Sequence, residues 1–130
     1  MYTETTRSIK ITVKPSFLED QSEPEDFHFV WAYRITIENQ GAETVQLLKR
    51  HWTITDSVGQ IQEVRGDGVV GEQPILEPGE VFEYTSGTPL NTPSGIMVGS
   101  YEMVDEQGAC FDVSVPAFSL DSPHQEAHLH

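Results

Sequence analysis

The stretch Phe27-His28-Phe29-Val30-Trp31-Ala32-Tyr33-Arg34-Ile35-Thr36-Ile37-Glu38 decides the fold of this 130-residue chain. Large apolar residues fill every second position of it: Phe27, Phe29, Trp31, Tyr33, Ile35 and Ile37. The intervening positions are mostly polar, with Val30 and Ala32 as the apolar exceptions. Side chains alternate between two faces in a β-strand, so this period of two predicts a long strand whose aromatic face covers a core.

Shorter alternating segments lie on both sides of this stretch, and turn residues separate them. We expect further strands at residues 9–13, 45–56, 61–64, 81–84, 96–104 and 110–120. Pro15 closes the first of these, and residues 85–95, which are rich in Ser, Thr, Pro, Gly and Asn, predict a surface loop. Within residues 45–56 the apolar phase slips between Leu47 and Leu48, which one extra residue in a β-bulge explains.

About seven short strands with turns between them, and no segment of helical period, predict an all-β fold. The expected architecture is a two-sheet antiparallel sandwich of the fibronectin type III or immunoglobulin kind, with an open barrel as the alternative. We expect one domain over residues 1–120 and a disordered C-terminal tail over residues 121–130, where apolar residues become scarce.

The balance of charge narrows the range of partners. Seven Lys and Arg residues stand against 21 Asp and Glu, which gives a net charge of −14. Such a field repels nucleic acid and anionic lipid, so we expect neither as a partner, and it favours cations or a basic protein surface. The single cysteine, Cys110, and the absence of an apolar leader after Met1 predict a cytoplasmic protein.

The stretch from Gly66 to Gly71 matches the G-x-G-x-x-G pattern of nucleotide-binding loops. That pattern needs a following helix, and Pro78 would interrupt one. We therefore expect a turn in which Gly66, Gly68 and Gly71 supply positive φ angles. A phosphate-binding nest of exposed amides needs no helix, so Gly66, Asp67, Gly68 and Gly71 remain the candidate binding residues.

Three other groups of residues have side chains that could support chemistry. The tail residues His124, Glu126, His128 and His130 could chelate a transition metal, but a functional metal site normally sits on ordered elements, so we expect no metal site. Cys110 opens an alternating strand, where a small apolar filler is more common than a nucleophile. Asp105 and Glu106 lie in a turn and are expected to be solvated. No catalytic residue and no cofactor are predicted.

Several longer stretches of the chain form one combined pattern. They are His51-Trp52-Thr53-Ile54-Thr55-Asp56 followed by Gly59, Glu63-Val64-Arg65-Gly66-Asp67-Gly68-Val69-Val70-Gly71-Glu72-Gln73-Pro74, Pro78-Gly79-Glu80, Tyr84-Thr85-Ser86-Gly87, Thr92-Pro93-Ser94-Gly95 and Gly99-Ser100-Tyr101. Together they resemble the ApaG family, and the resemblance covers the chain from about residue 9 to residue 120. The resemblance implies a small bacterial cytoplasmic protein with a fibronectin type III-like sandwich.

The resemblance also implies a range of roles. The family's gene often lies beside that of diadenosine tetraphosphate hydrolase, and under the name CorD it is associated with cobalt resistance and magnesium efflux. In eukaryotes the domain occurs in certain F-box proteins and in a polymerase-delta-interacting protein, where it resembles a protein-interaction unit. The resemblance carries over no catalytic residue.

The leading hypothesis is therefore a non-enzymatic binding module that recognises an unidentified protein partner through a sheet face or an exposed edge strand. Paired edge strands could also form a two-fold homodimer. The alternative hypothesis is binding of a nucleotide, phosphate or divalent cation at the loop from Gly66 to Gly71.

Overall fold

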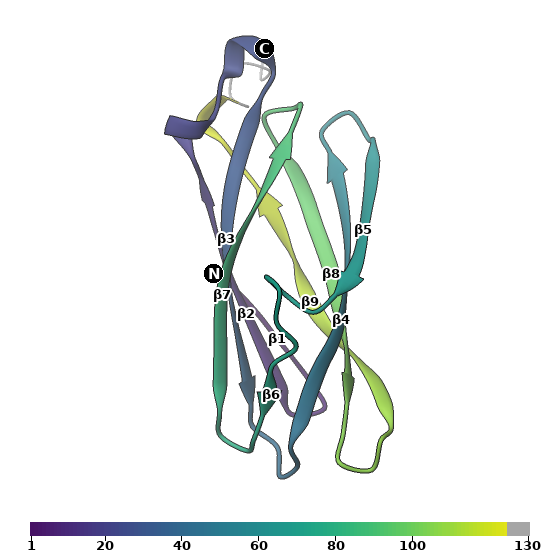
Figure 1. The fold of residues 1–130 in the computed structure, drawn as a ribbon. Coiled ribbons are helices and arrows are strands. Elements are labelled where there is room, and N and C mark those ends of the chain that lie inside the picture. The colour runs from purple at the N-terminus through teal and green to yellow at the C-terminus, as the bar shows by residue number, and fades with distance from the viewer. Residues whose placement is uncertain (125–130) are drawn as a thin grey trace.

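The computed structural model describes residues 1–124 and shows two antiparallel sheets packed face to face (Figure 1). The four-stranded sheet has the order β1-β2-β3-β7, and the five-stranded sheet has the order β5-β4-β8-β9 with β6 paired to β4. The strands are β1 (Tyr2–Thr6), β2 (Ile9–Phe17), β3 (Phe29–Asn39), β4 (Val45–Asp56), β5 (Ile61–Asp67), β6 (Ile75–Leu76), β7 (Val81–Leu90), β8 (Gly95–Val104) and β9 (Cys110–Leu120). The predicted all-β sandwich is confirmed.

The seven predicted strands correspond to β2, β3, β4, β5, β7, β8 and β9. Strand β5 pairs with β4 and stays in the sheet of β8 and β9. In immunoglobulin-like sandwiches the strand that follows strand C can join the sheet of C, F and G in the same way. Two 3-10 turns, η1 (Glu19–Gln21) and η2 (Pro24–Asp26), fill the acidic connection before β3.

Strand β3 carries the aromatic face that the sequence predicts, and its odd-numbered residues from Phe29 to Asn39 are buried. Trp31 is 1% exposed, and its indole Nε1 donates to the Asp121 carbonyl oxygen at 2.8 Å. Phe27 does not belong to this face. It ends η2 in a left-handed conformation with φ of 53° and is 69% exposed, so the strand begins two residues later than its alternation suggests.

Two strands run further than expected because each has an unpaired side. Strand β2 continues past Pro15 to Phe17. Strand β1 pairs with β2 only as far as Val13, so no strand lies on that side of Pro15 to need the backbone N–H that proline lacks. Strand β7 runs to Leu90 through the predicted loop, because it is an edge strand that tolerates Pro89.

Strands β1 and β6 were not predicted. The turn between β1 and β2 is made by Arg7 and Ser8, whose φ angles are 47° and 68°. Such angles usually require Gly or Asn, so the sequence contains no hairpin signal there. Strand β6 has only two residues, too few for an alternation to be visible.

The phase slip in β4 is a β-bulge, as expected. Leu47 pairs with Met103 and Lys49 with Glu102, which leaves Leu48 as the extra residue. Residues before the bulge point inward at odd positions, and Trp52 and Ile54 point inward at even positions after it. The bulge therefore lets one strand keep two apolar phases on the same side of the sheet.

Aromatic rings fill the centre of the sandwich, where Trp31, Tyr33 and Trp52 are all buried. The ring of Trp52 lies 5.5 Å from that of Tyr33 and 6.1 Å from that of Phe118 between centroids. Tyr33 belongs to the four-stranded sheet and the other two to the five-stranded sheet. Such edge-to-face contacts therefore join the two layers.

Carboxylates organise two of the hairpin turns. The Asp105 Oδ1 atom accepts from the amides of Gln107 and Ala109 at 2.9 and 3.0 Å. Asp56 does the same for Val58 and Gln60 at 3.0 and 2.9 Å. Asp105 thus holds a turn, where the sequence predicted only a solvated side chain.

Residues 121–124 lie against the sandwich, where the sequence predicted the start of a disordered tail. The Ser122 hydroxyl is buried and donates to the Pro93 carbonyl oxygen at 2.6 Å. The His124 ring packs against Phe17 at 5.7 Å between centroids. The rest of the expected tail, residues 125–130, lies outside the described residues. This range includes Glu126, His128 and His130, three of the possible metal ligands in the tail.

None of the helical segments in residues 1–124 has the length and apolar character needed to cross a membrane.

Candidate functional site

The glycine stretch forms a tight hairpin at the end of β5. The Val69 amide donates to the Glu72 carbonyl oxygen at 2.8 Å, and the Glu72 amide donates back to Val69 at 2.9 Å. Between them Val70 and Gly71 have φ angles of 44° and 83°. The predicted turn is therefore present, and no helix follows it before β6.

The three glycines serve different purposes. Gly68 has φ of 64°, and a Cβ atom there would lie 2.3 Å from the Glu72 carbonyl oxygen, so no side chain fits. Gly71 has positive φ with nothing within 4 Å of a Cβ. Gly66 differs from the expectation, because it lies in β5 and has no positive φ. A Cβ at Gly66 would lie 2.8 Å from the Arg50 guanidinium carbon, so its role is to make room for Arg50.

The hairpin, which we call the glycine loop (residues 66–74), is fixed to the bulge of β4. The Leu48 carbonyl oxygen accepts from the Gly68 amide at 2.8 Å and from the Gln73 Nε2 atom at 2.9 Å. The Arg50 Nη1 atom donates to the carbonyl oxygens of Asp67 and Gly68, both at 2.9 Å. The amides of Gly68, Val69 and Glu72 are thus occupied within the protein, which leaves little of a phosphate-binding nest.

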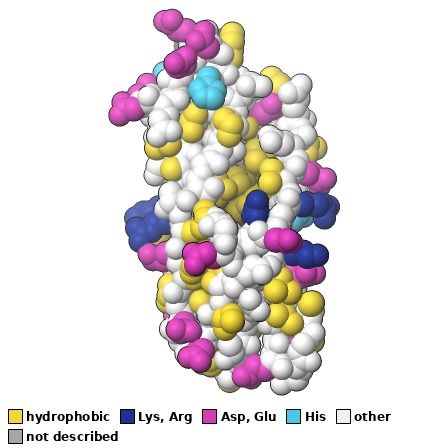
Figure 2. All heavy atoms as spheres, in the orientation of Figure 1, with side chains coloured by type: hydrophobic (Ala, Val, Ile, Leu, Met, Phe, Trp, Pro, Cys, Tyr) yellow, Lys and Arg dark blue, Asp and Glu magenta, His cyan; other side chains and the backbone are white. Residues whose placement is uncertain are grey.

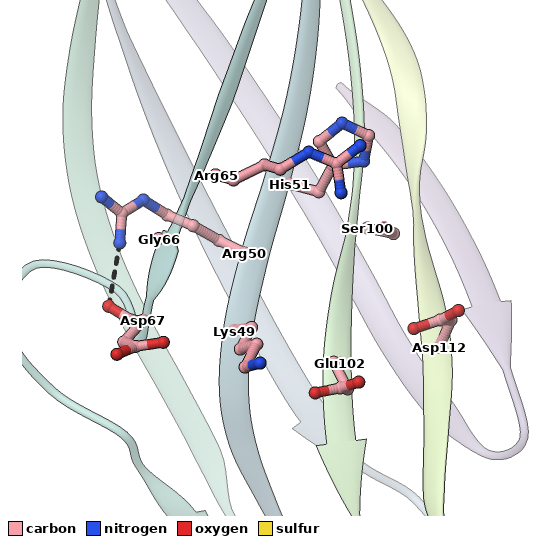
Figure 3. A pocket seen from close by; sticks show the side chains of 9 residues that line it. All are labelled: Lys49, Arg50, His51, Arg65, Gly66, Asp67, Ser100, Glu102 and Asp112. Carbon is pink, nitrogen blue, oxygen red and sulfur yellow. Dashed lines mark hydrogen bonds between the residues drawn. The ribbon is translucent and has the colours of Figure 1, made fainter.

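Basic residues gather beside the glycine loop on the outer face of the five-stranded sheet (Figure 3). A shallow basin of about 450 Å³ there is lined by Lys49, Arg50, His51, Arg65, Gly66, Asp67, Ser100, Glu102 and Asp112. Lys49 and Arg65 share this basin with the carboxylates of Asp67, Glu102 and Asp112. The Arg50 side chain extends away from Arg65 toward the glycine loop (Figure 3). Lys49 and Arg50 come from β4, which pairs with β5, so the residues next to the loop in sequence do not reveal them. The run Lys49-Arg50-His51 in so acidic a chain was the available signal.

The other half of that outer face is apolar. Ile61, Ile96 and Val98 are 67%, 54% and 41% exposed. The register places Thr55 between Ile61 and Ile96, and Thr53 beside Val98. We call these five residues the apolar band. An exposed cluster of large aliphatic side chains on one sheet face is typical of an interaction surface.

A third feature, the inter-sheet cleft, lies between β7 and the strands β4 and β5 and has a volume of about 310 Å³. Figure 2 shows it as a hollow of hydrophobic side chains between the layers, with a basic side chain beside it. Its lining includes Tyr33, Arg50, Trp52, Val64, Val69 and Tyr84. The glycine loop therefore forms one wall of this cleft.

Phenol groups make the polar part of the cleft. The Tyr84 hydroxyl lies 2.5 Å from that of Tyr101, and both tyrosines are buried. Burial raises the pKa of Tyr84 and of Tyr101, and the charge of Arg50 lowers each in part. Burial likewise raises the pKa of Tyr33, against a hydrogen bond with Ser86 and the charge of Arg50. The phenols therefore stay protonated and uncharged at neutral pH.

Known proteins with the same fold and sequence identify the family. The model of the ApaG domain matches residues 19–105. A protein named ApaG from Paramagnetospirillum magneticum is 67% identical over 129 residues, which are 99% of each chain. Another from Parvibaculum lavamentivorans is 63% identical over 130 residues, the whole of each chain. The chain belongs to the ApaG family.

A solved structure supports the same assignment to the ApaG family. The crystal structure of a Bordetella pertussis protein given the name ApaA is 48% identical and superposes with a TM-score of 0.86. The match covers 88% of this chain and 94% of that one. The ApaG sandwich is therefore shared along nearly the whole length of both proteins.

The remaining sequence candidates lie apart from these sites in the ApaG fold. Cys110 is an exposed free cysteine at the start of β9, so its interpretation as a core filler was wrong. Its side chain lies on the same exposed face of β9 as Asp112 and Ser114. The alternation along β9 did not show to which of the two faces Cys110 belongs. Among residues 1–124, no group of three or more potential ligands is placed to hold a metal ion.

Proposed function

We propose that this ApaG-family chain is a non-enzymatic protein-binding module that uses the outer face of its five-stranded sheet. The observation that carries the proposal is the apolar band, in which Ile61, Ile96 and Val98 are exposed on the same sheet face with Thr55 between Ile61 and Ile96. The charged basin borders it, and an apolar centre with a polar rim is the usual anatomy of a protein interface. A net charge of −14 favours a partner with a basic rim.

Two valines offer a matched test. Val98 lies in the apolar band at 41% exposure, and Val81 lies on the four-stranded sheet at 50% exposure. Tagged wild type, Val98→Asp and Val81→Asp would be used to retain partners from a lysate of the native bacterium. We expect a stoichiometric protein to remain with wild type and Val81→Asp, and its affinity for Val98→Asp to fall at least about tenfold.

Equal retention by both variants, with both still folded by their melting temperatures, would count against the proposed face. As part of the same proposal, the protein acts in the cytoplasm, in a pathway related to the cobalt resistance and magnesium efflux with which the family is associated. No residue is given a catalytic role. The partner could also be a second copy of this chain, paired through the edge strands as a homodimer. Light scattering would detect that dimer.

A second candidate function is nucleotide, phosphate or divalent cation binding beside the glycine loop. Lys49 and Arg65 in the basin favour the nucleotide or phosphate, and Asp67, Glu102 and Asp112 beside them are the carboxylates that a divalent cation would use. Calorimetry with ATP, diadenosine tetraphosphate, Mg²⁺ and Co²⁺ tests it, and Gly68→Val serves as the variant with an altered loop. Flat traces with every probe would remove this candidate.

A further inference from the structure

The inter-sheet cleft holds a cation that no carboxylate neutralises. The ion pairs among residues 1–124 are Arg34–Glu83, His51–Glu63 and His124–Glu19, and none involves Arg50. This occurs in a chain where acidic residues outnumber Lys and Arg by 21 to seven. A part-buried guanidinium without a counter-charge is well suited to bind an anion from solution.

The orientation of Arg50 is fixed before any ligand arrives. Its Nη1 atom is held by the carbonyl oxygens of Asp67 and Gly68, and its guanidinium lies against Gly66, where a Cβ atom would come within 2.8 Å of the guanidinium carbon. Figure 3 shows the other terminal nitrogen pointing away from Asp67. The Nε and Nη2 edge makes no hydrogen bond with any described residue, so it presents a two-donor fork.

The surroundings of that fork define the rest of a ligand. Trp52, Val64 and Val69 offer an apolar wall, and Tyr33 and Ser86 add hydroxyl groups. A volume of about 310 Å³ is at the small end of ligand pockets. The net charge of −14 disfavours a doubly charged phosphate more than a singly charged carboxylate.

We propose that the inter-sheet cleft binds a small carboxylate with an apolar body, whose head group pairs with Arg50 and whose body packs against Trp52, Val64 and Val69. This proposal does not depend on the protein-binding face, because Val98 and the rest of the apolar band lie on the outer side of the sheet.

The test is an NMR titration of the full chain that follows the Trp52 indole and the Val69 amide. The probes are 4-phenylbutyrate, the uncharged 4-phenylbutanol and phenyl phosphate. We expect saturable shifts at both groups with 4-phenylbutyrate, and binding of the alcohol and of phenyl phosphate to be weaker, the alcohol by roughly tenfold or more. No saturable shift with the carboxylate, or tighter binding of phenyl phosphate, would overturn the proposal.

Three variants sharpen the result. Because Arg50 also holds the glycine loop, Arg50→Gln can loosen both probes, and the expected result is that 4-phenylbutyrate loses roughly tenfold more affinity than the alcohol does. Lys49→Gln removes the same charge from the outer face and should change neither. Ser86→Leu keeps Arg50 and fills the cleft, so it should abolish binding of both probes. Unchanged carboxylate affinity in Ser86→Leu would refute the site even if Arg50→Gln failed to fold.

Discussion

The two open sides of the sandwich are closed in different ways. On one side β9 packs along β1 and β2, the Tyr2 ring meets Phe118 at 6.1 Å, and the Arg7 guanidinium lies 4.4 Å above the Phe111 ring. On the other side, within the described residues, β5 makes no comparable contact with β7. The glycine loop and Arg50 lie there instead, beside the inter-sheet cleft.

This difference separates the side that stabilises the fold from the side that is available for binding. Apolar and aromatic burial on the β1 and β9 side contributes directly to the free energy of unfolding. On the β5 and β7 side, the Arg50 side chain donates to the Gly68 carbonyl oxygen and the Gln73 side chain donates to the Leu48 carbonyl oxygen. These bonds fix the glycine loop on β4 and leave the cleft open. Substitutions on the first side should mainly change stability, and those on the second should mainly change the cleft.

The largest expected effect comes from a pair of phenylalanine substitutions, one on each side. Phe118→Ala removes a ring that is 1% exposed and contacts Tyr2, Tyr33 and Trp52, and should lower the free energy of unfolding by about 3–5 kcal/mol. Phe82→Ala, on the edge strand β7 and only partly buried, should cost clearly less. Urea denaturation measures both, and equal losses would contradict the comparison.

A smaller effect is expected in the glycine loop. Gly68→Ala combines a φ of 64° with a clash against the Glu72 carbonyl oxygen, so we expect a loss of about 2–3 kcal/mol. Gly71→Ala has the strained φ without a clash and should lose about 1 kcal/mol. Hydrogen exchange at the Val69 amide should accelerate more in Gly68→Ala. If the two variants behave alike, the close approach at Gly68 does not matter for stability.

The smallest effect is a loss of stability in alkaline solution. The folded protein raises the pKa values of Tyr84 and Tyr101 above their ordinary value near 10, so this contribution is fully present below pH 10. Above pH 10 the unfolded chain releases these protons first, and stability falls by up to about 1.4 kcal/mol per pH unit for each tyrosine. Urea unfolding between pH 9 and 11 should show a shallower fall in Tyr84→Phe. An unchanged slope would mean that Tyr84 has the same pKa in the folded and the unfolded chain, which would contradict the prediction.

The sequence predicted most of the fold because alternation and turn residues are local signals. The long aromatic strand and the bulge at Leu48 were both visible as patterns, and the structure confirms them. The β1 hairpin was not visible, because Arg7 and Ser8 adopt angles that their side chains rarely favour. The extent of β7 was missed because a proline is tolerated only where tertiary structure leaves the strand an edge.

The candidate site was only half visible. The glycine loop could be found from its motif, and its interpretation as a turn was correct for Gly68 and Gly71. The role of Gly66 depends on Arg50, which the bulge and the pairing of β4 with β5 bring beside it. The pairing of distant residues across strands is set by the whole sheet, so neither Arg50 nor the cleft could be derived from local spacing.

The bulge at Leu48 has a consequence beyond strand β4. The Leu48 carbonyl oxygen accepts hydrogen bonds from the Gly68 amide and from the Gln73 side chain. One inserted residue therefore positions the glycine loop, which is a wall of the inter-sheet cleft, although Leu48 does not line that cleft. Deleting Leu48 would give β4 an uninterrupted alternation and a simpler ladder, yet it would strip two donors of their shared acceptor. The β-bulge in β4 thus determines where the glycine loop lies and, through it, the shape of the inter-sheet cleft.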